Sequence, residues 1–282
     1  MGSYSRIGII AGGGDLPHSV IAGAIEGGAQ VFIAALEGFS APEDFGDMDA
    51  QPFRLGEVGR LIKTLKSKNL EAICFAGIVA RPDFSALRPD LGGVKYLPGA
   101  IKAATKGDDG LLRYVASIFD KEGIKVIGPQ QLCEGILAPL GPLGAHDIPD
   151  AMMSDAIKAR ETAKAIGALD IGQGAIVCKG LILAVEAQEG TDAMLSRAAG
   201  LPGALIGDSE ARAGVLAKMV KPGQEDRLDL PTIGVGTIIG AAYAGLAGIV
   251  LEQGRAFILD REGVIAAADA QGLFVVGLEA SS

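Results

Sequence analysis

Tryptophan is absent from this chain of 282 residues, aromatic residues make up only 5%, and histidine occurs twice. The core must therefore be built from Ala, Val, Ile and Leu, and the apolar share of 49% is enough for a substantial one. Two histidines, His18 and His146, are too few for a histidine-rich metal site and argue against a Ser-His-Asp triad. The three cysteines are far apart and lie beside apolar residues, so we expect small buried thiols in a reducing compartment: Cys74, Cys133 and Cys178.

A cluster of basic residues is also missing. Lys and Arg number 25 against 34 Asp and Glu, which gives a formal net charge of −9. Because a nucleic-acid backbone is bound by clustered Lys and Arg, we expect no nucleic-acid partner. An anionic ligand would have to be held by local donors: helix N-termini, single basic side chains or a metal ion.

Neither a secretory signal nor a membrane span is expected. The N-terminal "MGSYSRIGII" has no cleavage pattern and runs directly into a predicted strand. Leu230–Leu251 carries no charge and is long enough to cross a bilayer. It contains five glycines and Pro231, however, and fits a loop, a short buried helix and a strand better. We expect a cytoplasmic protein.

Apolar runs alternate with amphipathic segments in the first half of the chain, which predicts alternating strands and helices. In the segment 56–69, for example, Val58, Leu61 and Leu65 share one helical face. The predicted strands are 6–11, 30–36, 71–77 and 124–129, and the predicted helices are 16–27, 56–69 and 108–123. Continuous apolar strands separated by helices indicate a parallel sheet with both faces covered, a Rossmann-like α/β arrangement.

The segment 137–152, rich in proline and glycine, interrupts this pattern. We place a domain boundary there, with an N-terminal domain at 1–137 and a C-terminal domain at 138–282. The second domain is predicted to be a mixed α/β (α+β) unit. It should have a helix at 149–167, a hairpin around Lys179-Gly180, a helix from about Thr191, a strand in "GVLAKMVKP" and a second hairpin at 260–263.

"AGGGDLP", residues 11–17, lies between a predicted strand and a predicted helix. Backbone amides at such a turn suit a phosphate or another anion. The alternative is a tight β–α turn in which Asp15 caps the helix. Gly12-Gly13-Gly14 is followed by Asp15 and not by the spaced third glycine of the dinucleotide fingerprint, and Glu37 is the nearest acid that could hold a ribose.

Two further turns carry carboxylates. Asp108 and Asp109 begin a predicted helix, where they either compensate the helix dipole or reach a metal ion or a substrate hydroxyl. In "EAQEGTDAM", residues 186–194, Thr191 can cap the helix that follows, or the turn can present carboxylates and amides to a cleft. The acids of this second turn are Glu186, Glu189 and Asp192.

The most informative segment is "KPGQEDRLDLP", residues 221–231, which places two basic and three acidic residues before a long uncharged run. Charged groups that enter a buried region must be paired or must bind an ion. Carboxylates suit Mg²⁺, while Lys and Arg suit phosphate oxygens, so the set fits pyrophosphate chemistry in which a carboxylate activates water. The alternative is a salt-bridge network at a domain junction.

These segments together resemble one family. "IGIIAGGGDLP", "GDDGLLR", "EAQEGTDAML" and "KPGQEDRLDLPTIGVGTI" occur in this order over most of the chain, and the set is similar to the LpxI family of UDP-2,3-diacylglucosamine pyrophosphatases of Gram-negative bacteria. The resemblance implies two domains, dependence on Mg²⁺ (or Mn²⁺), and cleavage of UDP-2,3-diacylglucosamine to UMP and 2,3-diacylglucosamine 1-phosphate (lipid X) in lipid A synthesis. It also implies a peripheral location at the inner membrane. A homodimer is compatible with the sequence.

The family's acidic segment falls on Gln224, Asp226, Arg227 and Asp229, but Glu225 follows the Gln here, where relatives often have Asp. We therefore expect Asp226 to be the key acid and Glu225 the second choice. The expected catalytic residues are Asp226, Glu225 and Asp229; the expected substrate-binding residues are Gly12, Gly13, Gly14, Asp15, Lys221, Gln224, Arg227 and Thr191; the expected metal ligands are Asp226, Asp229 and Asp192. Competing hypotheses are a nucleotide- or NAD-binding oxidoreductase and a non-enzymatic protein that binds a nucleotide sugar or lipid.

Overall fold

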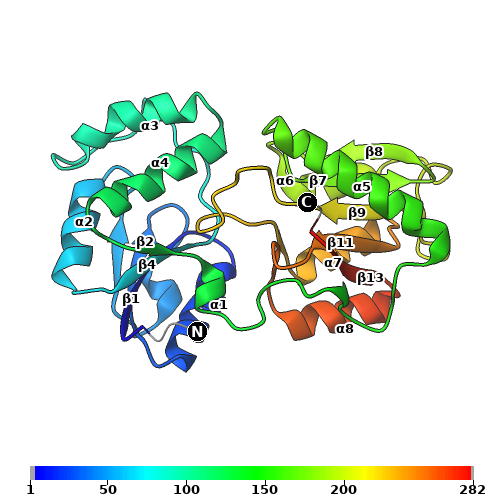
Figure 1. Ribbon diagram of the computed structural model, residues 1–282, viewed down its shortest axis with the longest axis horizontal. Coiled ribbons are helices and arrows are strands. Elements are labelled where there is room, and N and C mark those ends of the chain that lie inside the picture. The colour runs from blue at the N-terminus through cyan, green and yellow to red at the C-terminus, as the bar shows by residue number, and fades with distance from the viewer. Residues whose placement is uncertain (1–3, 281–282) are drawn as a thin grey trace. The chain divides into compact units, whose positions relative to one another are not determined.

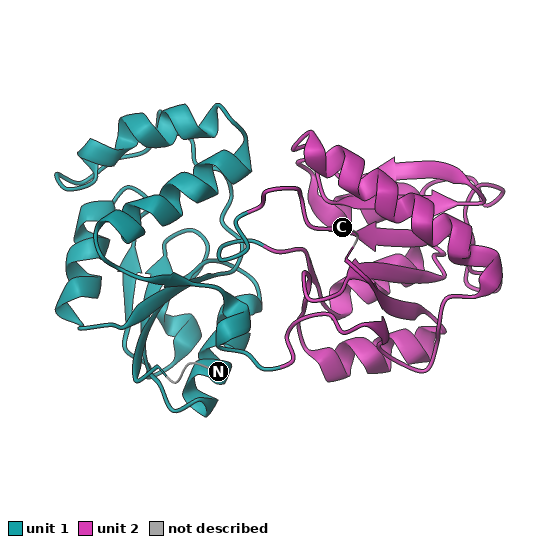
Figure 2. Ribbon diagram, viewed as in Figure 1, with its two compact units in different colours: residues 1–134, 225–229 teal, residues 135–224, 230–282 magenta. Residues whose placement is uncertain are grey.

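The computed structural model describes residues 4–280 (Figure 1). The chain forms two compact units: residues 1–134 with 225–229, and residues 135–224 with 230–282 (Figure 2). The first change of unit, at 134/135, lies close to the boundary that we placed at 137/138. Residues 225–229, however, pack with the first unit, although we had assigned them to the second domain. The chain therefore passes between the units three times.

Unit 1 contains a parallel sheet in the order β3-β2-β1-β4-β5. Its strands are β1 (Arg6–Ala11), β2 (Gln30–Leu36), β3 (Ala50–Phe53), β4 (Ala72–Ala76) and β5 (Val126–Ile127). Its helices are α1 (Leu16–Glu26), α2 (Val58–Ser67), α3 (Leu97–Ala104) and α4 (Asp108–Lys121), with short 3₁₀ turns at η1 (Pro42–Phe45), η2 (Val94–Tyr96) and η3 (Pro129–Gln131). The parallel sheet that the alternating pattern predicts is confirmed.

Helices cover both faces of this sheet. Residues of α1 pack with Ile7 and Ile9 of β1 on one face, and residues of α2 and α4 pack with Ile10 on the other. Strand residues buried on both faces account for the continuous apolar runs in the sequence. The sequence did not reveal β3, because "AQPF" is short and contains Pro52; proline is tolerated there because β3 is an edge strand.

Unit 2 contains a mixed sheet in the order β6-β13-β11-β9-β7-β8, and β10 pairs with β12 in a separate two-stranded sheet. The strands are β6 (Gly141–Pro142), β7 (Gly174–Cys178), β8 (Leu181–Val185), β9 (Val215–Lys218), β10 (Thr232–Ile233), β11 (Gly248–Glu252), β12 (Phe257–Ile258) and β13 (Phe274–Leu278). The helices are α5 (Asp150–Ala168), α6 (Gly190–Ala199), α7 (Val235–Tyr243) and α8 (Arg261–Gln271). Residues of α5 pack on one face of the larger sheet, and residues of α6, α7 and α8 pack on the other.

The hairpin predicted around Lys179-Gly180 is present as β7 and β8, but the one predicted at 260–263 is wrong. Asp260 instead caps α8: it has a left-handed backbone (φ 49°), and its side chain accepts a hydrogen bond from the Gly263 amide at 3.1 Å. The uncharged run from Leu230 contains the expected helix and strand, α7 and β11, but it also contains the short strand β10, and α7 is buried on one side only. Among residues 4–280, the helices are all too short or too polar to cross a bilayer.

Glu122, just after α4, joins three segments of unit 1. Its carboxylate accepts from Lys66 of α2 at 2.7 Å, from Lys95 at 3.0 Å and from the Tyr96 hydroxyl at 2.6 Å. These hydrogen bonds, that of Lys66 first, lower the pKa of Glu122 from 4.5 to about 2.

This lowered pKa predicts a pH-dependent contribution to stability. Because the folded value lies below the unfolded one, the contribution is fully present above about pH 4.5 and is lost as the pH falls towards about 2. We expect the difference in unfolding free energy between the wild-type chain and Glu122→Gln to shrink on acidification. Urea denaturation from neutral pH down to about pH 3 measures it; a difference that stays constant contradicts the prediction.

Candidate functional site

The segments that follow β1, β4 and β5 meet at the carboxyl edge of the sheet in unit 1. The turn Gly12–Asp15 follows β1, Ile78 follows β4 and Gln130 follows β5. The Gly13 amide donates to the Ile78 carbonyl at 2.9 Å, and the Ile78 amide donates to the Gly13 carbonyl at 2.8 Å. In open α/β sheets of this order, ligands bind at this edge, where the strand order reverses between β1 and β4.

Close packing of backbone on backbone explains part of the glycine turn. A Cβ atom on Gly12 would lie 2.6 Å from the Ile78 carbonyl oxygen, and Gly14 has a φ of +81°, which favours glycine. Gly13 is less restricted, since its nearest neighbour would be the Phe39 carbonyl oxygen at 3.2 Å. Asp15 occupies the N-cap position of α1, but its side chain makes no capping hydrogen bond.

The charged segment 225–229 packs against α4. The Glu225 amide donates to the Asp109 carboxylate at 3.3 Å, and Leu228 packs on the apolar cluster that contains residues of α2 and α4. The amides of Leu228 and Asp229 both donate to the Glu225 carbonyl, at 2.9 and 3.1 Å, so the segment forms a tight turn. These contacts fix the segment on unit 1 although both of its ends lead into unit 2.

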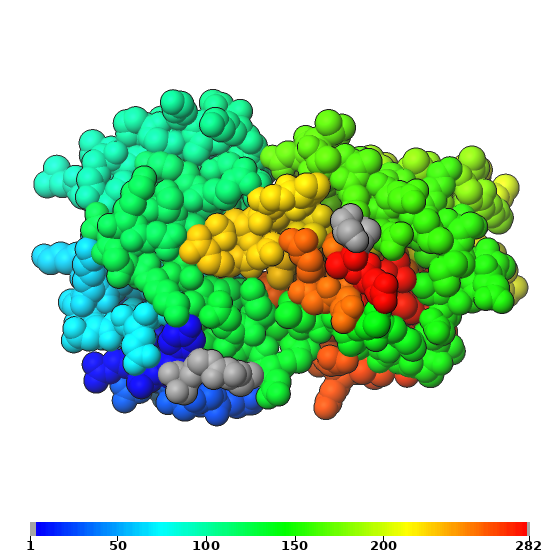
Figure 3. Space-filling model, in the orientation of Figure 1, coloured from blue at the N-terminus to red at the C-terminus, as the bar shows by residue number. Residues whose placement is uncertain are grey.

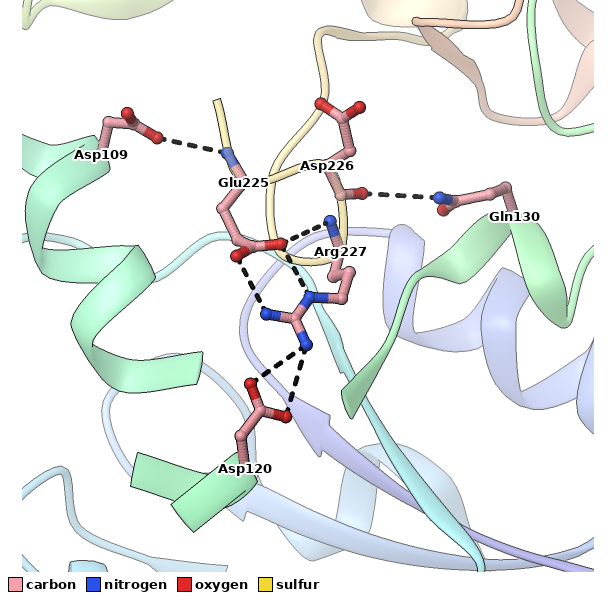
Figure 4. A network of polar contacts seen from close by, with 6 residues as sticks. All are labelled: Asp109, Asp120, Gln130, Glu225, Asp226 and Arg227. Atoms are coloured by element: carbon pink, nitrogen blue, oxygen red, sulfur yellow. Dashed lines mark hydrogen bonds and ion pairs between the residues drawn. The ribbon is translucent and has the colours of Figure 1, made fainter. Parts of the chain in front are cut away.

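The side chains of Glu225 and Arg227 form an ion pair with each other. The guanidinium of Arg227 makes two hydrogen bonds to the Glu225 carboxylate, at 2.8 and 3.0 Å, and reaches Asp120 of α4 at 3.2 Å (Figure 4). The hydrogen bonds from Arg227 hold the pKa of Glu225 below its usual value, and those from Glu225 raise the pKa of Arg227 above its own. Glu225 is therefore a weak base, and Arg227 anchors the turn.

Asp226 lies between these two residues, but its carboxylate is directed away from their ion pair (Figure 4). Its carbonyl oxygen lies 3.5 Å from the side-chain amide nitrogen of Gln130. The side-chain carbonyl oxygen of Gln130, Oε1, is buried and has no hydrogen-bond partner among the described residues. Sequence reasoning missed Gln130; the available signal was its position directly after the predicted strand 124–129, where the carboxyl edge of a parallel sheet is expected.

The carboxylates at the start of α4 are engaged within unit 1. Asp108 pairs with Arg81 at 3.2 Å, and Asp109 pairs with Arg113 at 2.6 Å in addition to its contact with the Glu225 amide. Both residues lie in the first turn of the helix, where negative charge is favoured by the helix dipole. Asp109 thus helps to hold the segment 225–229.

Unit 2 contributes the residues that precede this segment. Lys221 pairs with Asp170 at 2.8 Å, and its backbone amide donates to Oε1 of the buried Gln224 at 2.9 Å. Lys221 and Gln224, which we expected to bind the substrate, therefore fix the chain at the point where it leaves unit 2.

Of the two alternatives for the turn at Thr191, the helix cap is wrong, because α6 begins at Gly190 and Glu189 is its N-cap residue. The Thr191 hydroxyl instead donates to the buried Glu186 carboxylate at 2.7 Å and accepts from the buried Lys218 ammonium at 2.7 Å. Lys218 also donates to the Thr232 carbonyl at 3.0 Å, which fixes the point at which the chain re-enters unit 2. Glu189 pairs with Arg197 at 2.9 Å, and Asp192 is exposed.

Comparison with known proteins assigns the family. A model of the LpxI N-terminal domain matches residues 6–136, and a model of the LpxI C-terminal domain matches residues 139–276. The chain belongs to the LpxI family. The protein named UDP-2,3-diacylglucosamine pyrophosphatase LpxI of Caulobacter vibrioides is 51% identical over 277 residues, which cover 97% of this chain and 98% of the relative.

The expected metal ligands of this LpxI-family chain are divided between the units. Asp226 and Asp229 lie in the turn on unit 1, whereas Asp192 lies in α6 of unit 2. Among residues 4–280, no group of three or more His, Cys, Asp or Glu side chains is arranged to hold a metal ion. The described carboxylates thus form no complete cage made of protein ligands alone.

Proposed function

We propose that the chain hydrolyses the pyrophosphate bond of UDP-2,3-diacylglucosamine, giving UMP and 2,3-diacylglucosamine 1-phosphate. The observation that carries the proposal is the 51% identity, over nearly the whole of both chains, to a relative named for this pyrophosphatase activity. The site geometry supports it, because an acidic turn is held rigidly on α4 by Glu225, Arg227 and Asp109. A rigid support of this kind is what a catalytic side chain needs.

Asp226 is the residue that we assign to the chemical step. The oxygen of a water molecule bonds to one phosphorus atom, the bridging P–O bond breaks, and the released phosphate group takes the bridging oxygen with its electron pair. The carboxylate of Asp226 either takes the proton of the attacking water or would hold a metal ion, in which case that proton passes to solvent. Glu225 is less suited to either role, because its two oxygens already accept hydrogen bonds from Arg227. Gln130 supports the Asp226 backbone and offers a buried acceptor oxygen beside it.

We further propose that Mg²⁺ (or Mn²⁺) binds together with the substrate. Mg²⁺ is commonly held by one or two carboxylates plus substrate phosphates and water, so an Asp226-centred site without a third protein ligand fits this mode. When bound, the ion would neutralise charge on the pyrophosphate oxygens. The carboxylate of Asp226 is the first candidate ligand, and Asp229 follows it in the same turn.

Two other functions remain as alternatives. The strand order β3-β2-β1-β4-β5 is that of dinucleotide-binding domains, but the glycine turn lacks the spaced third glycine of their fingerprint. A binding protein without catalytic activity would hold the same nucleotide-linked lipid but release it uncleaved.

For the location, we propose a cytoplasmic protein that binds peripherally to the inner membrane, because the proposed substrate carries two acyl chains.

One assay tests the function and the metal together. We expect the purified chain to convert UDP-2,3-diacylglucosamine into UMP and 2,3-diacylglucosamine 1-phosphate, as read by mass spectrometry. We also expect EDTA to abolish turnover and added Mg²⁺ or Mn²⁺ to restore it. In ¹⁸O-labelled water, the product that carries the label identifies the attacked phosphorus. Stoichiometric binding without turnover favours the binding protein, binding of NAD favours the oxidoreductase, and full activity in EDTA refutes the metal proposal.

A further inference from the structure

The segment 88–106 of unit 1 has a charge opposite to that of the rest of the chain. It contains four basic residues and one acidic residue, a net charge of +3, in a chain whose net charge is −9. The segment includes η2 and α3 and lies on the outer side of α4 within unit 1 (Figure 1). Its residues, cyan to green in Figure 3, form part of the molecular surface.

Large apolar side chains of this segment face the solvent. Leu91 is fully exposed (100%), Val94 is 51% exposed and Ile101 is 45% exposed. The only fully buried residues between 88 and 106 are the small ones Gly93 and Ala104. The segment therefore contributes little to the core of unit 1, and among the described residues Leu91, Val94 and Ile101 belong to none of the apolar clusters.

One side of α3 faces α4 and the opposite side faces the solvent. Gly99 faces α4, because a Cβ atom there would meet the ring of Tyr114, whose hydroxyl donates to the Tyr96 carbonyl at 3.0 Å. At 100° per residue, Ile101 lies about 200° away from Gly99 around the helix. Val94 and Ile101, seven residues apart, thus share the side of the segment that is directed away from α4.

The charges are arranged so that the positive ones face outward. Asp90, the one acid, is turned inward, where its carboxylate accepts from the amides of Gly59 at 3.1 Å, Arg60 at 2.6 Å and Gly93 at 2.5 Å. Lys95 pairs with Glu122 at 3.0 Å. The side chains of Arg88, Lys102 and Lys106 are exposed, and within residues 4–280 none of the three makes a hydrogen bond or ion pair.

We infer that the segment 88–106 is a docking surface for an anionic lipid bilayer. Exposed apolar side chains flanked by unpaired basic ones are what an interfacial segment needs: the apolar groups enter the boundary of the acyl chains, and the basic groups lie at the anionic head groups. The positive charge also orients a chain that is otherwise strongly acidic, since the remaining surface is repelled by the bilayer.

This inference adds to the proposed function the surface by which the chain would reach a diacylated substrate, and it rests on that function for its biological role. Its test does not, because vesicle binding needs neither substrate nor turnover. We expect the full chain to co-sediment with vesicles that contain phosphatidylglycerol and not with vesicles of phosphatidylcholine alone, and we expect high salt to weaken the binding.

Single substitutions on α3 test the surface against matched controls elsewhere. Lys102→Gln should lower vesicle partitioning about fivefold, and Ile101→Ser about tenfold. The controls are Lys63→Gln on the exposed side of α2 and Ile239→Ser on α7, which is 57% exposed; both should bind vesicles as the wild type does. All four residues are exposed, so circular dichroism should show unchanged folding.

Three results would overturn the inference. The first is an absence of binding to anionic vesicles, and the second is an equal loss of binding in the control variants. The third is normal vesicle binding by Lys102→Gln and Ile101→Ser together with a raised KM for substrate in detergent micelles, which would make the segment a contact for the substrate's acyl chains. If instead the chain shows no hydrolysis at all but binds vesicles as expected, only the proposed function fails.

Discussion

Asp226→Ala is expected to lower kcat by about a hundredfold or more, because the loss of a general base or a metal ligand typically has an effect of this size. Both roles act mainly in the transition state, so the variant should still bind the substrate and can retain it uncleaved during purification. The turn that carries Asp226 is fixed on α4 through Glu225 and Arg227, so the loss should not come from unfolding. Steady-state kinetics, with mass spectrometry of the co-purified lipid, measures the effect.

Isosteric variants distinguish the role of Asp226 from that of Glu225. Asp226→Asn should lose nearly as much activity as Asp226→Ala, because the charge is needed. Glu225→Gln keeps the shape of the side chain that holds Arg227 and should lose much less. Asp229→Ala is a further comparison in the same turn. If Glu225→Gln is inactive and Asp226→Asn is active, our assignment of the key acid is wrong by one residue.

If none of these variants loses activity, the segment 225–229 is a structural network and the catalytic acids lie elsewhere. The structure narrows that search. Asp108, Asp109 and Glu189 are each paired with an arginine, whereas Asp192 is exposed in the first turn of α6. Asp192→Asn is therefore the next variant to measure.

The parts of the fold that the sequence predicted are those set by local pattern. The strands β1 and β2 have the predicted bounds, because each is one polar residue followed by an apolar run, and Gly12 follows β1 while Glu37 follows β2. The helix α4 begins at Asp108, where acidic residues follow a glycine. Burial on one or both faces of an element fixes the spacing of its apolar residues, so it can be recognised within the element itself.

The parts that the sequence did not predict depend on distant contacts. Nothing local in "QEDRL" shows that it leaves one unit and packs on the other, since its partners Asp109 and Asp120 are more than a hundred residues away. Gln130 was missed for the same reason: only the fold brings it to Asp226. At 260–263, Asp and Gly indicated a hairpin turn, but the same residues cap a helix, and the alanines that follow decide for the helix.

The second large effect is expected in the glycine turn, where substitutions of the neighbouring residues Gly12 and Gly13 should have different consequences. Gly12→Ala should destabilise the chain by about 1–3 kcal/mol, as for an overpacked core. Its Cβ atom would lie 2.6 Å from the Ile78 carbonyl oxygen and 3.0 Å from the Gly77 carbonyl carbon, and both are backbone atoms. They can move only if the hydrogen bonds between Gly13 and Ile78 stretch. Thermal unfolding measures the loss.

Gly13→Ala is the matched variant, because its Cβ atom would meet one atom at 3.2 Å and the next only at 3.7 Å. We expect it to fold with nearly unchanged stability. If the turn contacts the nucleotide part of the substrate, as its place at the carboxyl edge of the sheet suggests, the added methyl group should raise KM about tenfold and leave kcat unchanged. Unchanged kinetics in a folded Gly13→Ala protein would mean that the three glycines serve backbone packing alone. Equal stability of the Gly12 and Gly13 variants would instead refute the close contact with Ile78.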